Sequence, residues 1–306
     1  MFKALLQYLA FFFPSPVNLW LHRLSGAAVA SGVRIHPFVL LRAKHVSIDR
    51  KARIKMGTMI DVHSFRLGQK SSIGFFTLVK GESDLLIGDA CLIGPRSTID
   101  CTRTVRMGYY ASLGPRSVLY THGSFLPVTW GYPAKFEEVE IGDQVWISMN
   151  VTIGPGVRVG RGSLILPGTV LLEEIPEDRM VMGASPNLKM LPLGLVYTKP
   201  EEFETLARDM LSNFCGWATQ TEQAKVRIDG VVAYVRMGRR TRSVALRAPA
   251  DILLFLSPGE KRTAHYFNLR DLTTDPRSCP EKELLERYMR MYYGLIFRDD
   301  DTISSQ

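Results

Sequence analysis

The chain has 306 residues, of which 46% are hydrophobic, and it carries 38 Lys and Arg against 30 Asp and Glu, a net charge of +8. This length exceeds one typical domain, and the positive charge favours anionic partners such as phosphorylated cofactors, lipid-linked phosphates or a membrane surface. No long run of Lys and Arg and no zinc-finger, basic-zipper or RNP pattern is present, so nucleic acid is not an expected partner.

The N-terminal segment, residues 1–32, begins with an apolar stretch over residues 2–13. We expect a helix that ends at Pro14, because proline blocks helix continuation. Lys3 and Gln7 are its only polar residues and share one helical face. The stretch is too short to span a bilayer. Two interpretations stay open, an interfacial membrane helix and a cap that covers the first coil of the structure that follows.

From residue 33 to residue 195 the dominant feature is a six-residue hydrophobic period. In its clearest stretch the aliphatic residues are Ile141, Ile147, Ile153, Val159, Ile165 and Leu171. This period fits neither a helix nor a half-buried strand. It is typical of an all-β parallel β-helix, in which three hexads close one triangular coil and the aliphatic side chains stack inside.

Two other positions of the hexad have an expected role. The fifth residue is small, as at Ser97 and Ser117, and is expected to face inward. Glycine often follows the aliphatic residue, as at Gly94 and Gly114, and is expected to take a positive φ at the corner. The period also runs upstream, with register slips before Leu67 and Met107.

A long insertion, the loop 120–140, interrupts the repeats. A long loop that leaves a rigid scaffold is where function usually concentrates, and this one opens with His122. An imidazole has a pKa near neutral pH, so it can accept a proton from a hydroxyl that attacks a substrate. No second histidine lies within several residues of His122, so no zinc site is expected here.

From about residue 196 the six-residue period is gone. Helices are expected over residues 200–223 and 281–293. The strand-like stretches between them are Lys225–Met237, Ser243–Ala248, Asp251–Leu256 and Ala264–Leu269. We therefore predict that residues 196–306 form a small α+β accessory domain. The cysteines are scattered and are expected to be reduced packing residues: Cys91, Cys101, Cys215 and Cys279.

The hexads, the loop root Tyr120–Gly123 and the following Val145–Ile147 resemble the left-handed β-helix acyltransferases, the hexapeptide-repeat transferase family. The resemblance covers about residues 33–190. It implies a left-handed solenoid domain over residues 33–195 and a homotrimer with its active sites between neighbouring subunits. It also implies direct transfer from acetyl-CoA in a ternary complex, with His122 as the general base.

The resemblance further implies roles for individual residues. The backbone N–H of Met149 would be the oxyanion donor, and Trp146 would line the pantetheine region. Asp100, one coil earlier, either orients the imidazole or binds acceptor hydroxyls, or is a solvated corner residue. The last coils resemble the coenzyme A groove, with close backbone approach and one phosphate contact. These positions are Gly154, Gly168, Thr169 and Ala184 for the backbone and Lys189 for the phosphate.

The expected function is O-acylation of a sugar hydroxyl in surface or lipid-linked glycan biosynthesis, with acetyl-CoA as co-substrate, no metal, and a glycan or small-molecule acceptor. One alternative is N-acylation of an amino sugar or amino acid, which the same base would serve. Another is a non-catalytic β-helix scaffold whose C-terminal domain binds the partner. The expected location is the cytoplasm, at the inner face of a membrane if residues 2–13 bind lipid.

Overall fold

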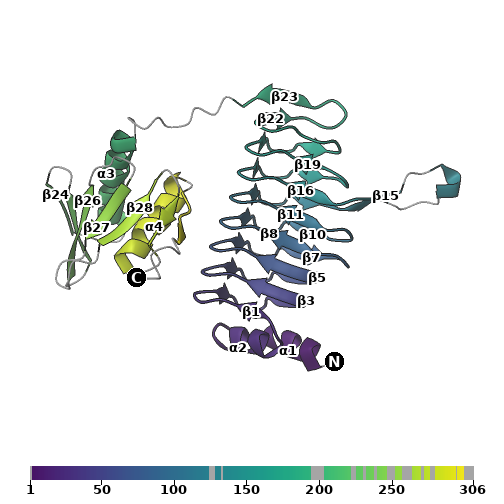
Figure 1. Ribbon diagram of the computed structural model, residues 1–306, viewed down its shortest axis with the longest axis horizontal. Helices are drawn as coiled ribbons and strands as arrows, with labels where there is room; N and C mark the ends of the chain where they lie inside the picture. The colour runs from purple at the N-terminus through teal and green to yellow at the C-terminus, as the bar shows by residue number, and fades with distance from the viewer. Residues whose placement is uncertain are drawn as a thin grey trace. The chain divides into compact units, whose positions relative to one another are not determined.

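The computed structural model describes residues 2–123, 128–131, 134–193, 203–221, 225–229, 232–237, 240–246, 252–256, 264–269, 272–275, 280–293 and 295–299. The chain forms two compact units, Met1–Leu195 and Val196–Gln306. The first is a β-helix that follows two short helices, and the second is an α+β domain (Figure 1). Within the described part of the chain, no helix is both long enough and apolar enough to span a membrane.

The first unit contains two helices, α1 (Phe2–Ala10) and α2 (Val17–Leu24), and the strands of the solenoid. The strands are β1 (Ala28–Val29), β2 (Arg34–Ile35), β3 (Leu40–Ile48), β4 (Arg53–Ile54), β5 (Met59–Leu67), β6 (Ser72–Ile73), β7 (Leu78–Lys80), β8 (Leu85–Ile87), β9 (Leu92–Ile93), β10 (Thr98–Asp100), β11 (Val105–Met107), β12 (Ser112–Leu113), β13 (Val118–Leu119), β14 (His122–Gly123), β15 (Lys135–Phe136), β16 (Val139–Ile141), β17 (Trp146–Ile147), β18 (Thr152–Ile153), β19 (Arg158–Val159), β20 (Leu164–Ile165), β21 (Val170–Leu171), β22 (Arg179–Met182) and β23 (Lys189–Pro192).

Apart from the β14–β15 pair and β23, which pair antiparallel, these strands form the three faces of a parallel β-helix, which confirms the fold class predicted from the period of six. One face is the path β2-β4-β6-β9-β12-β17-β20-β22. The other two are β7-β10-β13-β18-β21 and β8-β11-β16-β19, and the long strands β3 and β5 join them around one corner. This continuous strand accounts for the register slip before Leu67.

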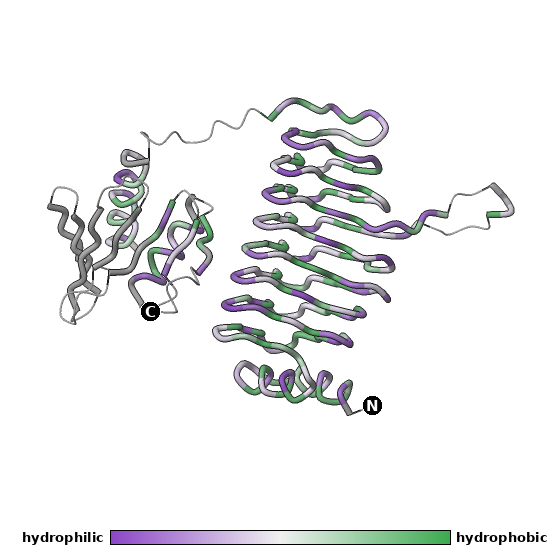
Figure 2. The backbone as a smooth tube through the Cα atoms, in the orientation of Figure 1, coloured by the Kyte–Doolittle hydropathy of each residue, from purple (hydrophilic) through white to green (hydrophobic). Residues whose placement is uncertain are grey.

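The aliphatic positions stack in register inside the coil. One column runs the length of the solenoid, and each of its members is at most 1% exposed: Ile35, Ile54, Ile73, Ile93, Leu113, Ile147, Ile165 and Val181. Full burial stabilises such a side chain by about 1.5–3 kcal/mol. Hydrophobic and hydrophilic residues alternate along each coil in Figure 2, because every second side chain points outward.

The small residues of the hexad also face inward, as predicted, and they connect successive coils. Ser97 is fully buried, and its hydroxyl donates to the carbonyls of Gly94 at 3.0 Å and Gly114 at 3.1 Å. Gly114 belongs to the following coil. The buried hydroxyl therefore has its hydrogen bonds satisfied and stabilises the stacking of two coils.

The glycines that follow the aliphatic residues do not take the positive φ that was expected, so that prediction was wrong. At the corners, the positive φ lies two residues further on, for example at Arg96 (φ 59°) and Arg116 (φ 58°). Gly94 and Gly114 are required for another reason, since a Cβ atom on either would overlap the backbone of the next coil. The close spacing of the coils, rather than the turn, selects glycine there.

The N-terminal helices cover the first coil. Helix α1 ends at Ala10, earlier than expected, and a second helix, α2, follows it with Pro16 at its N-cap. Gln7 is 2% exposed, and its Nε2 donates to the Ala43 carbonyl at 3.0 Å, while Lys3 Nζ donates to the Lys44 carbonyl. Both carbonyls belong to β3, so the polar face of α1 satisfies an edge of the solenoid that strand pairing leaves open there.

A buried histidine in helix α2 leads us to expect that the stability of this end of the chain depends on pH. His22 and Asn18 are fully buried, and no described residue forms a hydrogen bond with their side chains. Burial lowers the pKa of His22 to about 4 from 6.5. The unfolded chain therefore binds more protons between these pH values. We expect the stability of the cap to be complete above pH 6.5 and to fall by about 3 kcal/mol as the pH decreases to 4.

This expectation can be checked by measuring hydrogen exchange of the α2 amides across this pH range, in the wild type and in the His22→Leu variant. The substitution replaces the titrating imidazole with an apolar side chain that can fill the same buried position. The variant should lose most of the pH dependence. The same pH dependence in both proteins would contradict the assignment to His22.

The second unit contains α3 (Phe203–Thr221), α4 (Pro280–Tyr293) and one seven-stranded sheet in sequence order, all of it antiparallel except for its last pair. The strands are β24 (Lys225–Asp229), β25 (Val232–Met237), β26 (Arg240–Leu246), β27 (Ile252–Leu256), β28 (Ala264–Asn268), β29 (Thr273–Thr274) and β30 (Arg298–Asp299). Both helices are where the sequence predicted them. The stretch Lys225–Met237 is two paired strands rather than one.

A separate hydrophobic core joins the elements of the second unit. Phe214 of α3 and Tyr288 of α4 are buried with their ring centroids 5.3 Å apart, and Phe267 of β28 belongs to the same core. Cys215 lies in this core, whereas Cys91 and Cys101 lie inside the solenoid. All three are buried free thiols, and burial raises the pKa of each, to about 12 for Cys91 and about 11 for Cys215. Cys279 lies outside the described residues.

Candidate active site

His122 lies where the loop leaves the solenoid, directly after β13. It forms β14 with Gly123, and β14 pairs antiparallel with β15 (labelled in Figure 1). In this pairing His122 is opposite Phe136. The two rings stack with centroids 6.0 Å apart and an angle of 21° between their planes. The described part of the loop also contains a 3-10 helix, Val128–Trp130. The ends of the loop thus form a short ribbon that holds the imidazole on the outside of the coil.

Asp100 fixes the orientation of this imidazole. The Nδ1 atom of His122 lies 2.8 Å from Oδ1 of Asp100, which ends β10 one coil earlier. The same oxygen accepts from the Thr102 backbone N–H at 3.0 Å and from the Thr121 hydroxyl at 3.2 Å. Burial acts to raise the pKa of Asp100, but the hydrogen bonds from Thr102 and His122 outweigh it and leave the pKa below its usual value.

This arrangement sets the tautomer of His122. An ionised carboxylate only accepts hydrogen bonds, so Nδ1 must carry the proton, and Nε2 keeps its lone pair. The His122 side chain is 39% exposed and that of Asp100 is 11% exposed. The site therefore offers an oriented base to a ligand at the surface, and the carboxylate would stabilise the imidazolium that forms when the base takes a proton.

Met149 lies at a different corner of the coil. It follows β17, and the adjacent Asn150 N–H donates to the Pro115 carbonyl at 3.0 Å. From Arg116 at this corner to His122 the chain runs six residues along the β13 side, about 20 Å when extended. A cavity of about 530 Å³ lies at the Met149 corner, lined by aromatic, proline and arginine side chains of successive coils. Met149 therefore lies at the other end of this side from His122, one coil further along the solenoid.

The expected cofactor residues divide between the two corners. Gly154 follows β18 beside the His122 corner, where the Tyr120 N–H donates to the carbonyl of Ile153 at 3.0 Å. Gly168 stacks on Met149, with its N–H donating to the Met149 carbonyl at 3.2 Å. Thr169 follows it, but its side chain is fully buried and its hydroxyl donates to the Leu166 carbonyl at 2.7 Å. Its carbonyl accepts from the Thr152 N–H at 2.9 Å, so the side chain and the backbone carbonyl of Thr169 are both engaged within the solenoid.

The remaining three expected cofactor residues are on the outer surface. Trp146 is 61% exposed on β17, between Ser112 and Leu164 of the adjacent coils. Ala184 is exposed and pairs with Val170 at the end of the solenoid. Lys189 is exposed at the start of β23. No described contact joins any of these three residues to His122.

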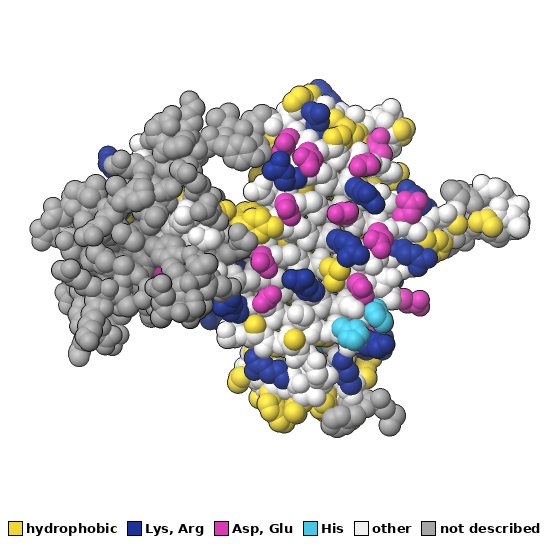
Figure 3. Space-filling model, in the orientation of Figure 1, with side chains coloured by type: hydrophobic (Ala, Val, Ile, Leu, Met, Phe, Trp, Pro, Cys, Tyr) yellow, Lys and Arg dark blue, Asp and Glu magenta, His cyan; other side chains and the backbone are white. Residues whose placement is uncertain are grey.

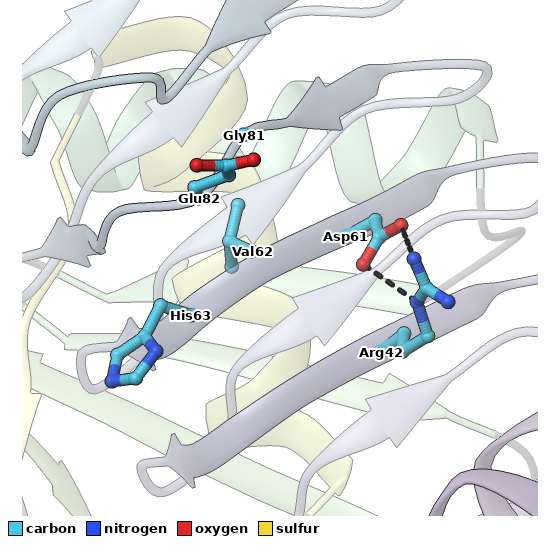
Figure 4. Close-up of a pocket in the computed structure, with 6 residues that line it drawn as sticks. All are labelled: Arg42, Asp61, Val62, His63, Gly81 and Glu82. Carbon is cyan, nitrogen blue, oxygen red and sulfur yellow. Dashed lines mark hydrogen bonds and ion pairs between the residues drawn. The ribbon is translucent and has the colours of Figure 1, made fainter.

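A shallow cavity of about 410 Å³ lies on the coils that precede Asp100. Its walls include Arg42, Asp61, His63 and Glu82, and Arg42 forms an ion pair with Asp61 (Figure 4). The strand register carries a charged residue on four successive coils: Arg42, Asp61, Lys80 and Asp100. Sequence reasoning singled out none of the first three. Their spacing of 19 or 20 residues, one coil, was the signal that could have found them.

No group of three or more His, Cys, Asp or Glu side chains in the described residues has an arrangement that could hold a metal ion.

Comparison with known proteins identifies the repeats. Residues 138–173 match the family model described as Bacterial transferase hexapeptide (six repeats). These residues include the coils that carry Trp146, Met149, Gly154 and Gly168. This part of the solenoid therefore consists of bacterial transferase hexapeptide repeats.

Three curated proteins are similar over parts of the chain. YvoF of Bacillus subtilis is 37% identical over 71 residues, 23% of this chain and 37% of its own length. Galactoside O-acetyltransferase of Escherichia coli is 26% identical over 122 residues, 39% of this chain and 50% of its own length. Bifunctional protein GlmU of Bartonella quintana is 28% identical over 162 residues, 52% of this chain and 31% of its own length. The chain thus spans half or less of each of these relatives.

Two solved structures are similar to parts of the chain. A hexapeptide-repeat acetyltransferase from Vibrio cholerae, complexed with acetyl coenzyme A, is 22% identical, with a TM-score of 0.31 over 44% of this chain and 69% of its own. AntD, an N-acyltransferase from Bacillus cereus in complex with dTDP and 3-hydroxybutyryl-CoA, is 14% identical, with a TM-score of 0.36 over 61% of this chain and 90% of its own.

Proposed function

We propose that this protein is a coenzyme A-dependent O-acyltransferase that moves an acetyl group from acetyl-CoA to a sugar hydroxyl. The observation that carries the proposal is the His122–Asp100 pair at the root of the loop, with Nε2 left as a base at the surface. The match of residues 138–173 to transferase repeats and the similarity to a galactoside O-acetyltransferase support the same chemistry.

In the proposed reaction the acceptor hydroxyl attacks the thioester carbonyl carbon while Nε2 of His122 takes its proton. The negative charge that develops on the carbonyl oxygen is stabilised by the backbone N–H of Met149. Collapse of the tetrahedral intermediate breaks the carbon–sulfur bond, and the leaving thiolate takes the proton from the imidazolium. The products are an acetyl ester and coenzyme A. Asp100 favours the imidazolium in between and keeps the ring oriented.

We assign the coenzyme A contacts from the resemblance of the sequence to the hexapeptide-repeat transferase family. Trp146 would pack against the pantetheine arm, and Lys189 would meet a phosphate of the nucleotide end. Gly154 and Gly168 would allow close approach of the backbone. Thr169 and Ala184 would also lie where the backbone can approach the cofactor closely, and the buried hydroxyl of Thr169 would not contact it.

The site is proposed to lie between two copies of the chain, in a homotrimer. His122 and Met149 are at different corners of successive coils, so we place the thioester that contacts both between His122 of one copy and Met149 of another. Trp146 is largely exposed on the face that leads to the Met149 corner, where it could serve the same ligand. Three parallel solenoids side by side would form three such sites.

Mixed oligomers test this arrangement. We expect His122→Ala and Trp146→Glu chains to be nearly inactive when each is expressed alone. When the two are expressed together, some sites receive His122 from one copy and Trp146 from the other, so part of the wild-type activity should return. The measurement is the acetylation rate of the purified mixed oligomer, with a mixture of the two separately purified variants as the control. If each chain contains its own complete site, no activity will return.

The shallow cavity beside Arg42, His63 and Glu82 supports a sugar acceptor. It lies on the same side of the solenoid as Asp100, and its polar side chains can exchange hydrogen bonds with several hydroxyl groups. A chain of sugars bound there would extend along the coils toward His122. We place the reaction in the cytoplasm because coenzyme A thioesters are available there. Residues 196–306 would form an accessory domain.

The direct test is release of coenzyme A thiol from acetyl-CoA in the presence of candidate sugars, followed by mass spectrometry of the product. An acetyl ester on a sugar oxygen is the expected result. If the product is instead an amide of an amino sugar or amino acid, the protein is an N-acyltransferase, and His122 would still be its general base. If the protein does not bind coenzyme A, the acyltransferase proposal is wrong, and the alternative of a non-catalytic scaffold protein remains.

A further inference from the structure

The two N-terminal helices expose an apolar surface instead of burying it. Eight large hydrophobic side chains of this segment are 42–66% exposed, and we call them the cap surface: Leu5, Tyr8, Leu9, Phe12, Phe13, Val17, Trp20 and Leu24. The polar Gln7 of the same helix is 2% exposed. An amphipathic helix on a globular protein normally has the opposite orientation, with its apolar face toward the core.

Covering the solenoid does not explain the cap surface. The contact of α1 with β3 uses Lys3 and Gln7, and the packing between the helices uses Leu6, Ala10 and Leu21. Of the outward side chains, Tyr8 also contacts β3, because its hydroxyl accepts a hydrogen bond from Arg42 at 3.1 Å, while Tyr8 remains 46% exposed. For the other seven, no contact with β3 or between the helices is described. A contiguous exposed apolar surface on the end of a protein generally marks a binding surface for a partner or a membrane.

The charge of the chain is concentrated at the same end. Residues 1–60 carry nine Lys or Arg and one Asp or Glu, whereas residues 61–306 carry 29 of each. The whole net charge of +8 therefore belongs to the cap and the first coils. Arg34, Lys44 and Arg53 are exposed on β2, β3 and β4. On the face shown in Figure 3, Lys and Arg side chains lie next to the hydrophobic side chains at this end of the solenoid.

We propose that the cap surface binds the anionic surface of a lipid membrane. The helices α1 and α2 lie in the interface with their apolar side chains among the acyl chains, while the basic side chains of the first coils contact lipid phosphates. Tyr8 and Trp20 suit this position, because Tyr and Trp are enriched at membrane interfaces. A second copy seated on the cap surface is a poorer occupant, because it would bring another set of these basic side chains directly against the first, whereas lipid phosphates carry the opposite charge.

The test is sedimentation of the full-length protein with vesicles. Vesicles made of equal parts phosphatidylcholine and phosphatidylglycerol should bind it, and pure phosphatidylcholine should bind it much less. Phe12→Ser combined with Trp20→Ser should abolish binding. Arg34→Gln combined with Lys44→Gln should weaken it about thirtyfold, because each basic side chain near an anionic surface contributes about a fivefold factor.

Matched substitutions at the far coils serve as controls, and unfolding curves show whether each variant is folded. Leu191→Ser removes an apolar side chain that is 39% exposed on β23, and Arg106→Gln combined with Arg161→Gln removes two exposed charges. Neither should change binding. Equal binding to neutral vesicles would overturn the electrostatic part. Absence of vesicle binding, or dimerisation of the lipid-free protein that Phe12→Ser with Trp20→Ser abolishes, would overturn the whole proposal. None of these outcomes depends on transferase activity.

Discussion

His122→Ala is expected to lower kcat for acetyl transfer by about 10²–10⁴-fold, the range typical of losing a general base. The KM for acetyl-CoA should change little, because the ring acts on the acceptor proton and is not assigned to the cofactor. Steady-state rates with saturating acetyl-CoA and a reactive acceptor provide the measurement. An undiminished kcat would show that another group takes the proton, and the proposed mechanism would then be wrong.

Asp100 offers a graded control for the same reaction. Its Oδ1 atom accepts all three hydrogen bonds, from His122, Thr102 and Thr121. In Asp100→Asn the amide oxygen can take this place, so only the charge is lost, and the decrease in kcat should be the smaller one. In Asp100→Ala the imidazole also loses its orientation, and kcat should fall further. Equal effects of the two substitutions would mean that the hydrogen bonds do not position the ring.

The second large effect concerns the interior of the solenoid. Ile93 is 1% exposed and stacks between Ile73 and Leu113 of the adjacent coils. Ile93→Ala should lower the free energy of unfolding by about 2–5 kcal/mol, because it removes buried methyl groups and leaves a cavity that the neighbouring coils cannot fill. Urea denaturation, combined with hydrogen exchange of the β9 and β12 amides, measures the loss and locates it.

The adjacent Leu92 is the matched control. It belongs to the same strand but points outward and is 42% exposed. Leu92→Ala should change the free energy of unfolding by less than about 1 kcal/mol, as is usual for surface substitutions. A similar loss for both variants would mean that stacked aliphatic columns do not dominate the stability of the solenoid.

The stacked columns were predictable because they depend on a pattern that is local in sequence. Every sixth side chain must face inward if each hexad forms one side of a coil, so Ile93 and Ile147 could be assigned to the core without coordinates. Position after β13, at the root of a long loop, also singled out His122. These features need only the order of residues along the chain.

The features that the sequence did not predict depend on the distance between coils. The expected glycine φ angles were wrong because coil spacing, which the sequence pattern does not contain, requires a small residue at Gly114. The pairing of Asp100 with His122 stayed undecided because it joins residues 22 positions apart, slightly more than one coil. Helix α2 was missed because Pro14 and Pro16 suggested only the end of a helix, while Pro16 also begins the next one.

Because the coils stack in parallel at a constant spacing, the number of coils fixes the distance between two sites along the solenoid axis. In-register pairing from Leu41 through Ile60, Val79 and Ile99 to Leu119 places β13 four coils above β3, at about 4.8 Å per coil. The imidazole that follows β13 is thus about 20 Å along the axis from the strand beneath which α1 lies. Inserting or removing one coil of 19 or 20 residues would change this height by about 5 Å without altering any side chain at the reaction centre. Chains that differ only in their number of coils would therefore hold the imidazole at different distances from the N-terminal helices, and each distance would suit an acceptor of a different length.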